Sequence, residues 1–254
     1  MLSVSSRFRF TFLALAAVLA SAGVQAAGVT AYISAQGPDA NALNTQSPPT
    51  LSQSVIETIT AFNAKSTRIG GNEFEGNPPT LGFSYNDGAG QASFSGANTP
   101  AIMATSEQVP PPTGRYNTTG AATGEEGQPG VPTNGHWIET AYGFSMGFTQ
   151  SISALSFFIT DLGDFQGSFE LKLHLSDGST VAIPLSNNAK DDPNHPAAGA
   201  GSDPNGNLLY FGVTSETYGI SSVDFSLTQQ AGDLGDYDYV GFDSFRIGRF
   251  NVAP

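Results

Sequence analysis

The sequence predicts an all-β protein, an antiparallel two-sheet sandwich of jelly-roll-like type. Three observations support this prediction: apolar and polar residues alternate in several segments, turn-forming dipeptides separate these segments, and the 254 residues include 30 glycines and 16 prolines. Alternation with a period of two places one face of a strand in a core and the other in solvent. Many short strands joined by turns are typical of sandwiches and jelly rolls.

Residues 1–26 have the composition of a secretory signal peptide. Arg7 and Arg9 precede an apolar stretch, and residues 24–26 (Val-Gln-Ala) provide the small side chains that a signal peptidase recognises. The alternative is a membrane anchor, but the apolar stretch is shorter than the roughly 20 residues of a spanning helix. We therefore expect residues 27–254 to form a single exported domain that has no membrane span after cleavage.

The chain is strongly acidic and contains no cysteine. Its 22 acidic residues outnumber 9 lysines and arginines, which gives a formal net charge of −13, or −15 without the two arginines of the leader. Such a charge repels nucleic acid and anionic membranes, whereas it attracts cations such as calcium. The absence of cysteine excludes disulfides, cysteine nucleophiles and thiolate metal sites.

The clearest strand is Phe169–Leu175, in which phenylalanine and leucine alternate with Glu170, Lys172 and His174. Asp177-Gly178 follows and predicts a hairpin with the next segment, STVAIPL. Apolar residues at 223, 225 and 227 alternate in the same way with Ser222, Asp224 and Ser226. Further strands are expected at Val29–Ser34, Leu81–Tyr85, Gln91–Ser95, Trp137–Phe148, Ile152–Thr160, Leu208–Val213 and Tyr239–Ile247.

Three other segments are harder to assign or lack regular structure. Residues 52–62 fit a helical stripe through Val55, Ile59 and Phe62, but their β-branched residues favour a strand, which is the prediction adopted. Residues 97–135 and 186–207 are rich in proline, glycine and small polar residues, so we predict two long loops. Loops of this length are usually functional or disordered.

The order of motifs from Gly114 to Gly248 resembles one group of bacterial proteins. The motifs TDLGDF, NGNLLYFGV and GFDSFRIG carry most of this resemblance, which is to β-sandwich domains of PEP-CTERM exoproteins. The resemblance implies export to the bacterial envelope or extracellular matrix, and it implies no catalytic activity. Members of this group typically continue into a sorting tail. This chain stops at NVAP, so we expect a protein that is released or retained by other contacts.

Alternation predicts that two acidic residues point towards the core. In YVGFDSFRI, Asp243 shares a strand face with Phe245 and Ile247, and Glu57 lies between Val55 and Ile59 if its segment is a strand. A buried, ionised carboxylate is strongly unfavourable unless it is paired or binds a cation.

We therefore predict a structural calcium ion held by Glu57 and Asp243, because calcium prefers oxygen ligands. Asp236 and Asp238 are possible further ligands, and they belong to a region where the sequence Asp-Leu-Gly-Asp of residues 161–164 is repeated. The alternatives are an arginine partner for Asp243 and a solvated bend at residues 233–238.

A second group of residues suggests a sugar-binding site. Asp161 and Asp164 follow an apolar strand, and Arg115, Tyr116 and Trp137 lie in or beside the first predicted long loop. Aromatic rings stack on sugars while nearby polar groups bind their hydroxyls. The alternative for Trp137, the only tryptophan, is packing in the core, which is the favoured interpretation.

The sequence gives little support for an enzyme. The three histidines lack metal-ligand spacing, and no nucleophile elbow is present. A glycosidase needs only two carboxylates, for which the candidates are Glu125, Glu126, Glu139, Asp161 and Asp164. The predicted function is therefore non-catalytic binding of extracellular polysaccharide or matrix components at the cell surface, with calcium as a stabiliser. The alternatives are a self-associating structural protein and, less favoured, a glycan-active hydrolase.

Overall fold

The described part of the protein is an all-β structure with one helix. The computed structural model describes residues 28–34, 53–74, 79–96, 99–104, 136–162, 167–185, 208–229 and 239–252. Within these ranges every strand pairing is antiparallel. The elements are β1 (Val29–Ile33), α2 (Gln53–Lys65), β2 (Ser66–Asn72), β3 (Phe83–Tyr85), β4 (Gly90–Ser95), β5 (Ala101–Ala104), β6 (His136–Thr140), β7 (Phe144–Ile152), β8 (Ala154–Thr160), β9 (Gly167–Leu175), β10 (Thr180–Leu185), β11 (Leu208–Ser215), β12 (Ile220–Gln229) and β13 (Val240–Phe250).

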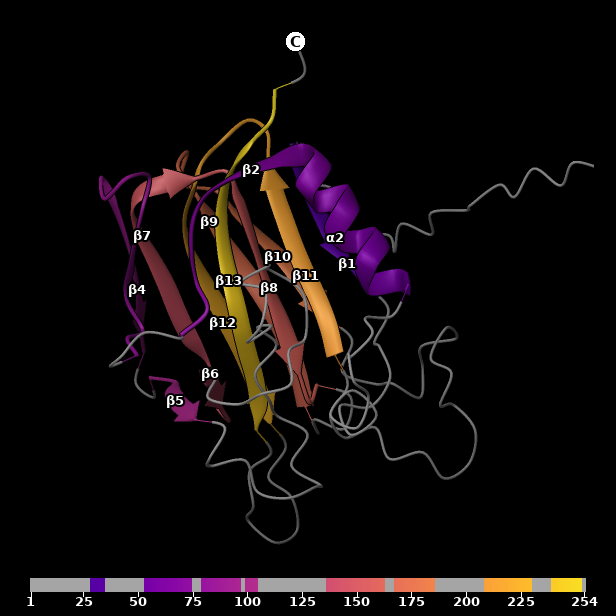
Figure 1. The fold of residues 1–254 in the computed structure, drawn as a ribbon, viewed down its shortest axis with the longest axis vertical. Helices are drawn as coiled ribbons and strands as arrows, with labels where there is room; N and C mark the ends of the chain where they lie inside the picture. The colour runs from indigo at the N-terminus through magenta and orange to yellow at the C-terminus, as the bar shows by residue number, and fades with distance from the viewer. Residues whose placement is uncertain are drawn as a thin grey trace, which may run out of the picture.

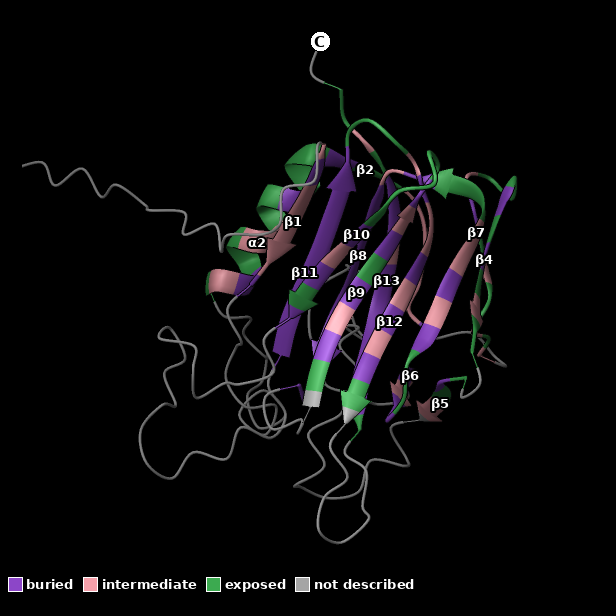
Figure 2. Cartoon of the chain, turned by 180° about the vertical axis from the view of Figure 1, so that it is seen from behind, coloured by how far each residue is buried: buried purple, intermediate pink, exposed green. Residues whose placement is uncertain are grey.

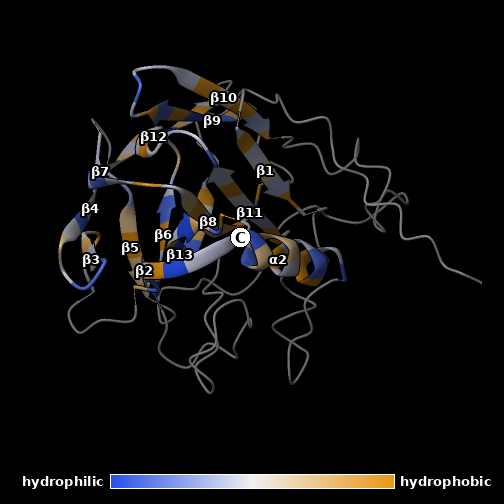
Figure 3. Cartoon of the chain, turned by 90° about the horizontal axis from the view of Figure 1, so that it is seen from above, coloured by the Kyte–Doolittle hydropathy of each residue, from blue (hydrophilic) through white to orange (hydrophobic). Residues whose placement is uncertain are grey.

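The strands form one continuous sheet that curls on itself. Its order is β1-β11-β8-β13-β2-β3-β4-β7-β12-β9-β10, with β6 paired to β13 and β5 paired to β6. Seen from above, the sheet is nearly closed into a barrel, with α2 on its outside (Figure 3). The all-β, antiparallel prediction is confirmed. The strands nevertheless belong to one sheet rather than two, because β2, β3 and β4 connect the two sides.

The predicted strands outside residues 52–62 each overlap an observed strand. The single strand expected at Trp137–Phe148 is two strands, β6 and β7, separated by a turn at residues 141–143. β2 and β5 were not predicted, and β5 occupies part of the expected loop at 97–135. Residues 105–135 and 186–207 lie outside the described residues.

The Asp177-Gly178 hairpin forms as predicted. Gly178 has a φ of 85°, which glycine adopts without strain. Asp177 Oδ1 accepts hydrogen bonds from the backbone N–H of Ser179 at 3.0 Å and from its hydroxyl at 2.6 Å. These bonds lower the pKa of Asp177 below its usual value. The turn therefore fixes the register in which β9 pairs with β10.

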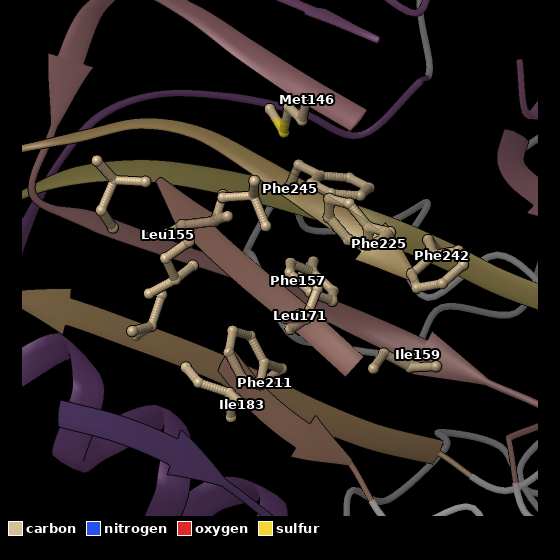
Figure 4. Packing of buried hydrophobic residues seen from close by; sticks show 14 of the residues in the cluster. Met146, Leu155, Phe157, Ile159, Leu171, Ile183, Phe211, Phe225, Phe242 and Phe245 are labelled. Atoms are coloured by element: carbon tan, nitrogen blue, oxygen red, sulfur yellow. The ribbon is translucent and has the colours of Figure 1, made fainter. Parts of the chain in front are cut away.

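A core of phenylalanine rings fills the space inside the curled sheet (Figure 4). Phe225 stacks on Phe144 with ring centres 4.2 Å apart, and Phe157 stacks on Phe245 at 5.0 Å. Each strand supplies alternate residues to this core, so the opposite residues of β7, β9 and β12 face outward (Figure 2). Because the chain has no disulfide, burial of these rings is the main described source of stability.

The strand predicted at residues 52–62 is wrong, because Gln53–Lys65 is a helix. Val55 and Phe62 lie on one side of α2 and are fully buried against the outer face of the sheet. Thr58 and Thr60 donate hydrogen bonds to the carbonyls four residues earlier, at 2.7 and 2.8 Å. Tertiary burial therefore outweighs the β preference of the threonines.

Gly212 of β11 explains why the helix can lie so close to the sheet. A Cβ at this position would be 2.7 Å from the ring of Phe62, so only glycine leaves room for that ring. The helix covers β11 and lies beside β1 and β2 (Figure 1). No helix in the described part of the chain is long and apolar enough to cross a membrane.

Candidate functional site

The candidate site is the outward face of four neighbouring strands, here called the polar face. Its residues are intermediate or exposed along strands whose alternate residues are more buried (Figure 2), and those alternate residues belong to the core or pack against it. Alternation along each strand selects these residues. The polar face consists of Ser93 and Ser95 of β4, Ser145 and Gly147 of β7, Ser222, Asp224 and Ser226 of β12, and Glu170, Lys172 and His174 of β9.

Strand register arranges the polar face in rows. Ser95 is opposite Ser145, Ser145 is opposite Asp224, and Asp224 is opposite Lys172. The next row contains Ser93, Gly147, Ser222 and His174 in the same strand order. Because neighbouring strands lie about 4.8 Å apart, each row spans roughly 14 Å. The result is an outward-facing surface in which five of the ten residues are serines and four others carry ionisable side chains.

Asp224 connects the strands at the centre of the polar face. Its Oδ1 accepts a hydrogen bond from the Ser145 hydroxyl at 2.7 Å, and its Oδ2 lies 2.7 Å from Nε2 of His174. Partial burial raises the pKa of Asp224, but the hydrogen bonds from His174 and Ser145 and the positive charges of His174 and Lys172 outweigh it. The net pKa is therefore below its usual value, and the carboxylate is ionised near neutral pH.

These three residue types are those of a serine hydrolase, but their arrangement is different. A nucleophilic serine is activated by direct contact with the histidine, while the carboxylate contacts the far side of the imidazole. Here the carboxylate lies between the two other residues. It accepts a hydrogen bond from the Ser145 hydroxyl at one oxygen and contacts His174 at the other. This geometry holds a negative charge and polar hydrogen-bonding groups in place, and it differs from a catalytic triad because the described contacts of Ser145 do not include His174.

The predicted calcium ligands do not meet within the described residues. Glu57 was placed on a strand face, which is wrong, because it is exposed on α2, where it accepts a hydrogen bond from Gln53 at 2.9 Å. Asp236 and Asp238 lie outside the described residues. The described part of the chain has no group of three or more histidines or acids placed to hold a metal ion.

Asp243 is 0 % exposed, so its predicted burial is confirmed. It does not share a strand face with Phe245, however, as the alternation predicted. Ser244 has a φ of 52°, and the register between β13 and β8 shifts between Asp243 and Arg246. This irregularity puts Phe242 and Phe245 in the same core, so Asp243 is on the opposite face of the sheet, beside Phe158. There its Oδ1 accepts a hydrogen bond from the Ser244 N–H at 2.6 Å.

The described residues of the predicted sugar site are buried. Trp137 and Asp161 are each 2 % exposed, and Asp161 has a φ of 64° where β8 ends. Both lie near the beginning of β13, since Ile138 pairs with Phe242 and Thr160 with Gly241. The Trp137 ring is therefore packed and is not available for stacking on a sugar. Arg115, Tyr116 and Asp164 lie outside the described residues.

Asp224 and Ser145 were not among the predicted site residues. Alternation at residues 222–227 places Asp224 on a polar face, but only the register shows that β12 lies between β7 and β9. The histidine, the aspartate and the serine are far apart in the sequence, and no motif connects them.

No protein-family model matches the chain, and no curated protein matches it. The resemblance to the domains of PEP-CTERM exoproteins stays an expectation. A functional assignment therefore has to come from the geometry of the chain's own residues.

Proposed function

We propose that the protein is an exported, non-catalytic polysaccharide-binding protein that acts at the cell surface or in the extracellular matrix. The observation that carries the proposal is the polar face, in which Asp224 is fixed between Ser145 and His174 on the outside of the sheet. The signal-peptide pattern of residues 1–26 supports export. The strongly negative charge argues against nucleic acid as the ligand.

The chemistry of the polar face suits a carbohydrate chain. Serine hydroxyls both donate and accept hydrogen bonds, as sugar hydroxyls do, while Asp224 accepts and Lys172 donates. No large aromatic side chain belongs to this face, so the affinity for a single sugar unit is expected to be low. Useful affinity then requires many weak contacts along one chain, so we expect binding of a polysaccharide rather than of a monosaccharide.

Affinity electrophoresis and pull-down on a panel of soluble and insoluble polysaccharides would test the proposal. The mature wild-type chain is compared with a D224A/S145A double variant. The matched control is D177N, because Asp177 is exposed at the hairpin turn and is not part of the polar face. We expect retention of the wild type and the control, with roughly tenfold weaker retention of the double variant. Equal retention of all three proteins would contradict a role for this face.

Calcium remains part of the proposal as a stabiliser, with Asp243 as its described ligand. The support is the complete burial of this carboxylate, since a calcium ion could bind the Asp243 oxygens in addition to the contacts that they already make. We expect calcium to raise the melting temperature of chelator-treated wild type and of D87N, a change in an exposed turn. D243N should remove the rise. A wild type that does not respond to calcium would exclude the ion.

A second candidate function is self-association. The outer strands β1 and β10 each pair on one side only within the described sheet, and free edges can pair with another chain. Size-exclusion chromatography with light scattering distinguishes this function. A concentration-dependent oligomer without polysaccharide retention would favour self-association over polysaccharide binding as the function. Release of reducing sugars that is lost in E139Q would instead indicate a hydrolase.

A further inference from the structure

A pocket of about 270 Å³ lies at the end of the curled sheet where β2, β7 and β13 meet the turns before β4 and β12. Its apolar surface comes from Ile69 and Ile152. Its polar surface comes from Asn86, Gln150, Ser151 and Arg249. Ligand pockets of this kind combine apolar walls with a few placed polar groups.

The polar groups of the pocket hold one another in place. Arg249 Nη2 donates a hydrogen bond to Asn86 Oδ1 at 2.6 Å, and Asn86 Nδ2 donates to Gln150 Oε1 at 3.3 Å. The backbone of Gln150 is fixed in turn by Tyr85, whose hydroxyl donates to its carbonyl and accepts from its N–H at 3.0 Å. The orientation of Arg249 is therefore supported by contacts that reach a buried tyrosine.

Glycines allow the walls to come together. A Cβ on Gly219 would lie 2.4 Å from the Ser151 hydroxyl, and a Cβ on Gly90 would lie 2.3 Å from the Tyr85 ring. The turn before β12 and the start of β4 can approach the pocket only because these residues have no side chain. The pocket is therefore an open site at the surface, with Gln150, Ser151 and Arg249 exposed along its walls.

Arg249 presents a positive charge in a strongly acidic protein. Its hydrogen bond to Asn86 uses one of the five N–H donors of a guanidinium. Within the described residues it has no carboxylate at ion-pair distance, whereas Arg68 is paired with Glu73. A guanidinium with free parallel N–H groups matches the two oxygens of a carboxylate.

We propose that this pocket binds a uronic acid unit, with its carboxylate on Arg249 and its hydroxyls on Asn86, Gln150 and Ser151. The inference rests on the proposed polysaccharide binding and names the kind of sugar at one end of the bound chain. Ser151 follows Ser145, Gly147 and Thr149 at alternate positions of β7, so the pocket lies at the end of a strand of the polar face. A chain lying along β7 can thus reach the pocket.

The charge of the protein restricts which acidic chain can bind. A net charge of −13 repels a polyanion over the Debye length of about 8 Å at physiological salt. The contact of one carboxylate with Arg249 is shorter than this range. We therefore expect a mainly neutral polysaccharide with an occasional or terminal uronate, and not a polyuronate.

The first experiment compares glucuronate with glucose, using NMR titration of the mature chain. We expect glucuronate to shift signals of residues around Arg249, while glucose at the same concentration does not. R249Q should weaken glucuronate binding roughly tenfold or more, and R249K, which keeps the charge but loses the fork, should also weaken it. R68Q is the matched control and should bind as the wild type does.

Several outcomes would overturn the inference. Equal binding of glucose and glucuronate would exclude carboxylate recognition, and unchanged binding by folded R249Q would exclude Arg249. Competition by inorganic phosphate as strong as that by glucuronate would indicate a general anion site. The two proposals can fail separately. Normal polysaccharide retention by R249Q would refute only the proposed uronate binding at Arg249. Retention that is lost in D224A/S145A but kept in R249Q would support the polar face alone.

Discussion

The imidazole Nε2 of His174 lies 2.7 Å from Oδ2 of Asp224, on the next strand of the sheet. Both side chains are more than one third exposed, at 36 % and 37 %. The contact therefore joins β9 and β12 at the surface, where water screens it. Its contribution to stability is expected to be small, and its pH dependence can be stated from the direction of the Asp224 pKa.

The first prediction concerns acid stability. The folded pKa of Asp224 is below its ordinary value of 3.8, so folding favours the ionised carboxylate. This contribution to the free energy of unfolding is fully present above pH 3.8, and it is lost as the pH falls through the folded pKa of Asp224. We expect D224N to lose no more than about 1 kcal/mol at neutral pH, as exposed pairs do. The difference from wild type should vanish in strong acid, which urea unfolding at several pH values measures. A gap that widens below pH 3.8 would contradict this assignment.

The second prediction concerns Tyr85, a buried tyrosine that lines the pocket containing Arg249. The hydroxyl of Tyr85 is hydrogen-bonded to both backbone groups of Gln150. Y85F leaves these groups without that partner, so we expect a loss of about 1–3 kcal/mol in the free energy of unfolding. Y218F at an exposed tyrosine should change stability little. If Y85F were as stable as Y218F, the hydroxyl would not hold the end of β7.

The third prediction compares two glycines in strands. A Cβ at Gly90 would be 2.3 Å from the Tyr85 ring, whereas a Cβ at Gly147 would be 3.9 Å from the Ser93 hydroxyl. G90A is therefore expected to cost about 1–3 kcal/mol through overpacking, and G147A should be neutral or slightly stabilising, by up to about 1 kcal/mol. Thermal and urea unfolding of both variants measures the difference. Equal effects would show that close approach at Gly90 is unimportant.

The fourth prediction concerns the aromatic core. Phe225 is 1 % exposed and has ring contacts with Phe144, Phe157 and Phe242. F225A leaves a cavity among these rings and should lower the free energy of unfolding by about 3–5 kcal/mol. F225L, which keeps more of the volume, should lose less. An F225A protein with the same denaturation midpoint as wild type would be inconsistent with the observed packing.

Ser244 shows where sequence patterns are insufficient. Alternation along YVGFDSFRI assigned Phe242 and Phe245 to opposite faces, but the positive φ of Ser244 brings both into the core. Such a bulge adds one residue to a strand and reverses the face of everything before it. Asp177-Gly178 was predictable because a turn dipeptide determines local backbone geometry. The bulge at Ser244 has no comparable signal, since serine rarely adopts this conformation.

The candidate sites show the same difference between features that a local sequence pattern predicts and features that depend on contacts between distant segments. The alternation of Phe169–Leu175 and of residues 222–227 correctly predicted their outward faces, but not that β7, β12 and β9 are neighbours. Helix α2 was missed because burial of Phe62 against Gly212 depends on contacts between distant segments. The pocket that contains Arg249 combines residues from five separate parts of the chain, so no local pattern could have predicted it.

Pro184 lies on β10, the last strand at one end of the curled sheet. Proline has no N–H to offer a further strand, so backbone pairing is weakened at this edge. The opposite edge, β1, has no proline. Strand addition by a second copy of the chain is therefore expected to be more favourable beside β1 than beside β10. Two copies paired through β1 would each leave a Pro184-containing strand at the outer edge, which would weaken further growth of the sheet.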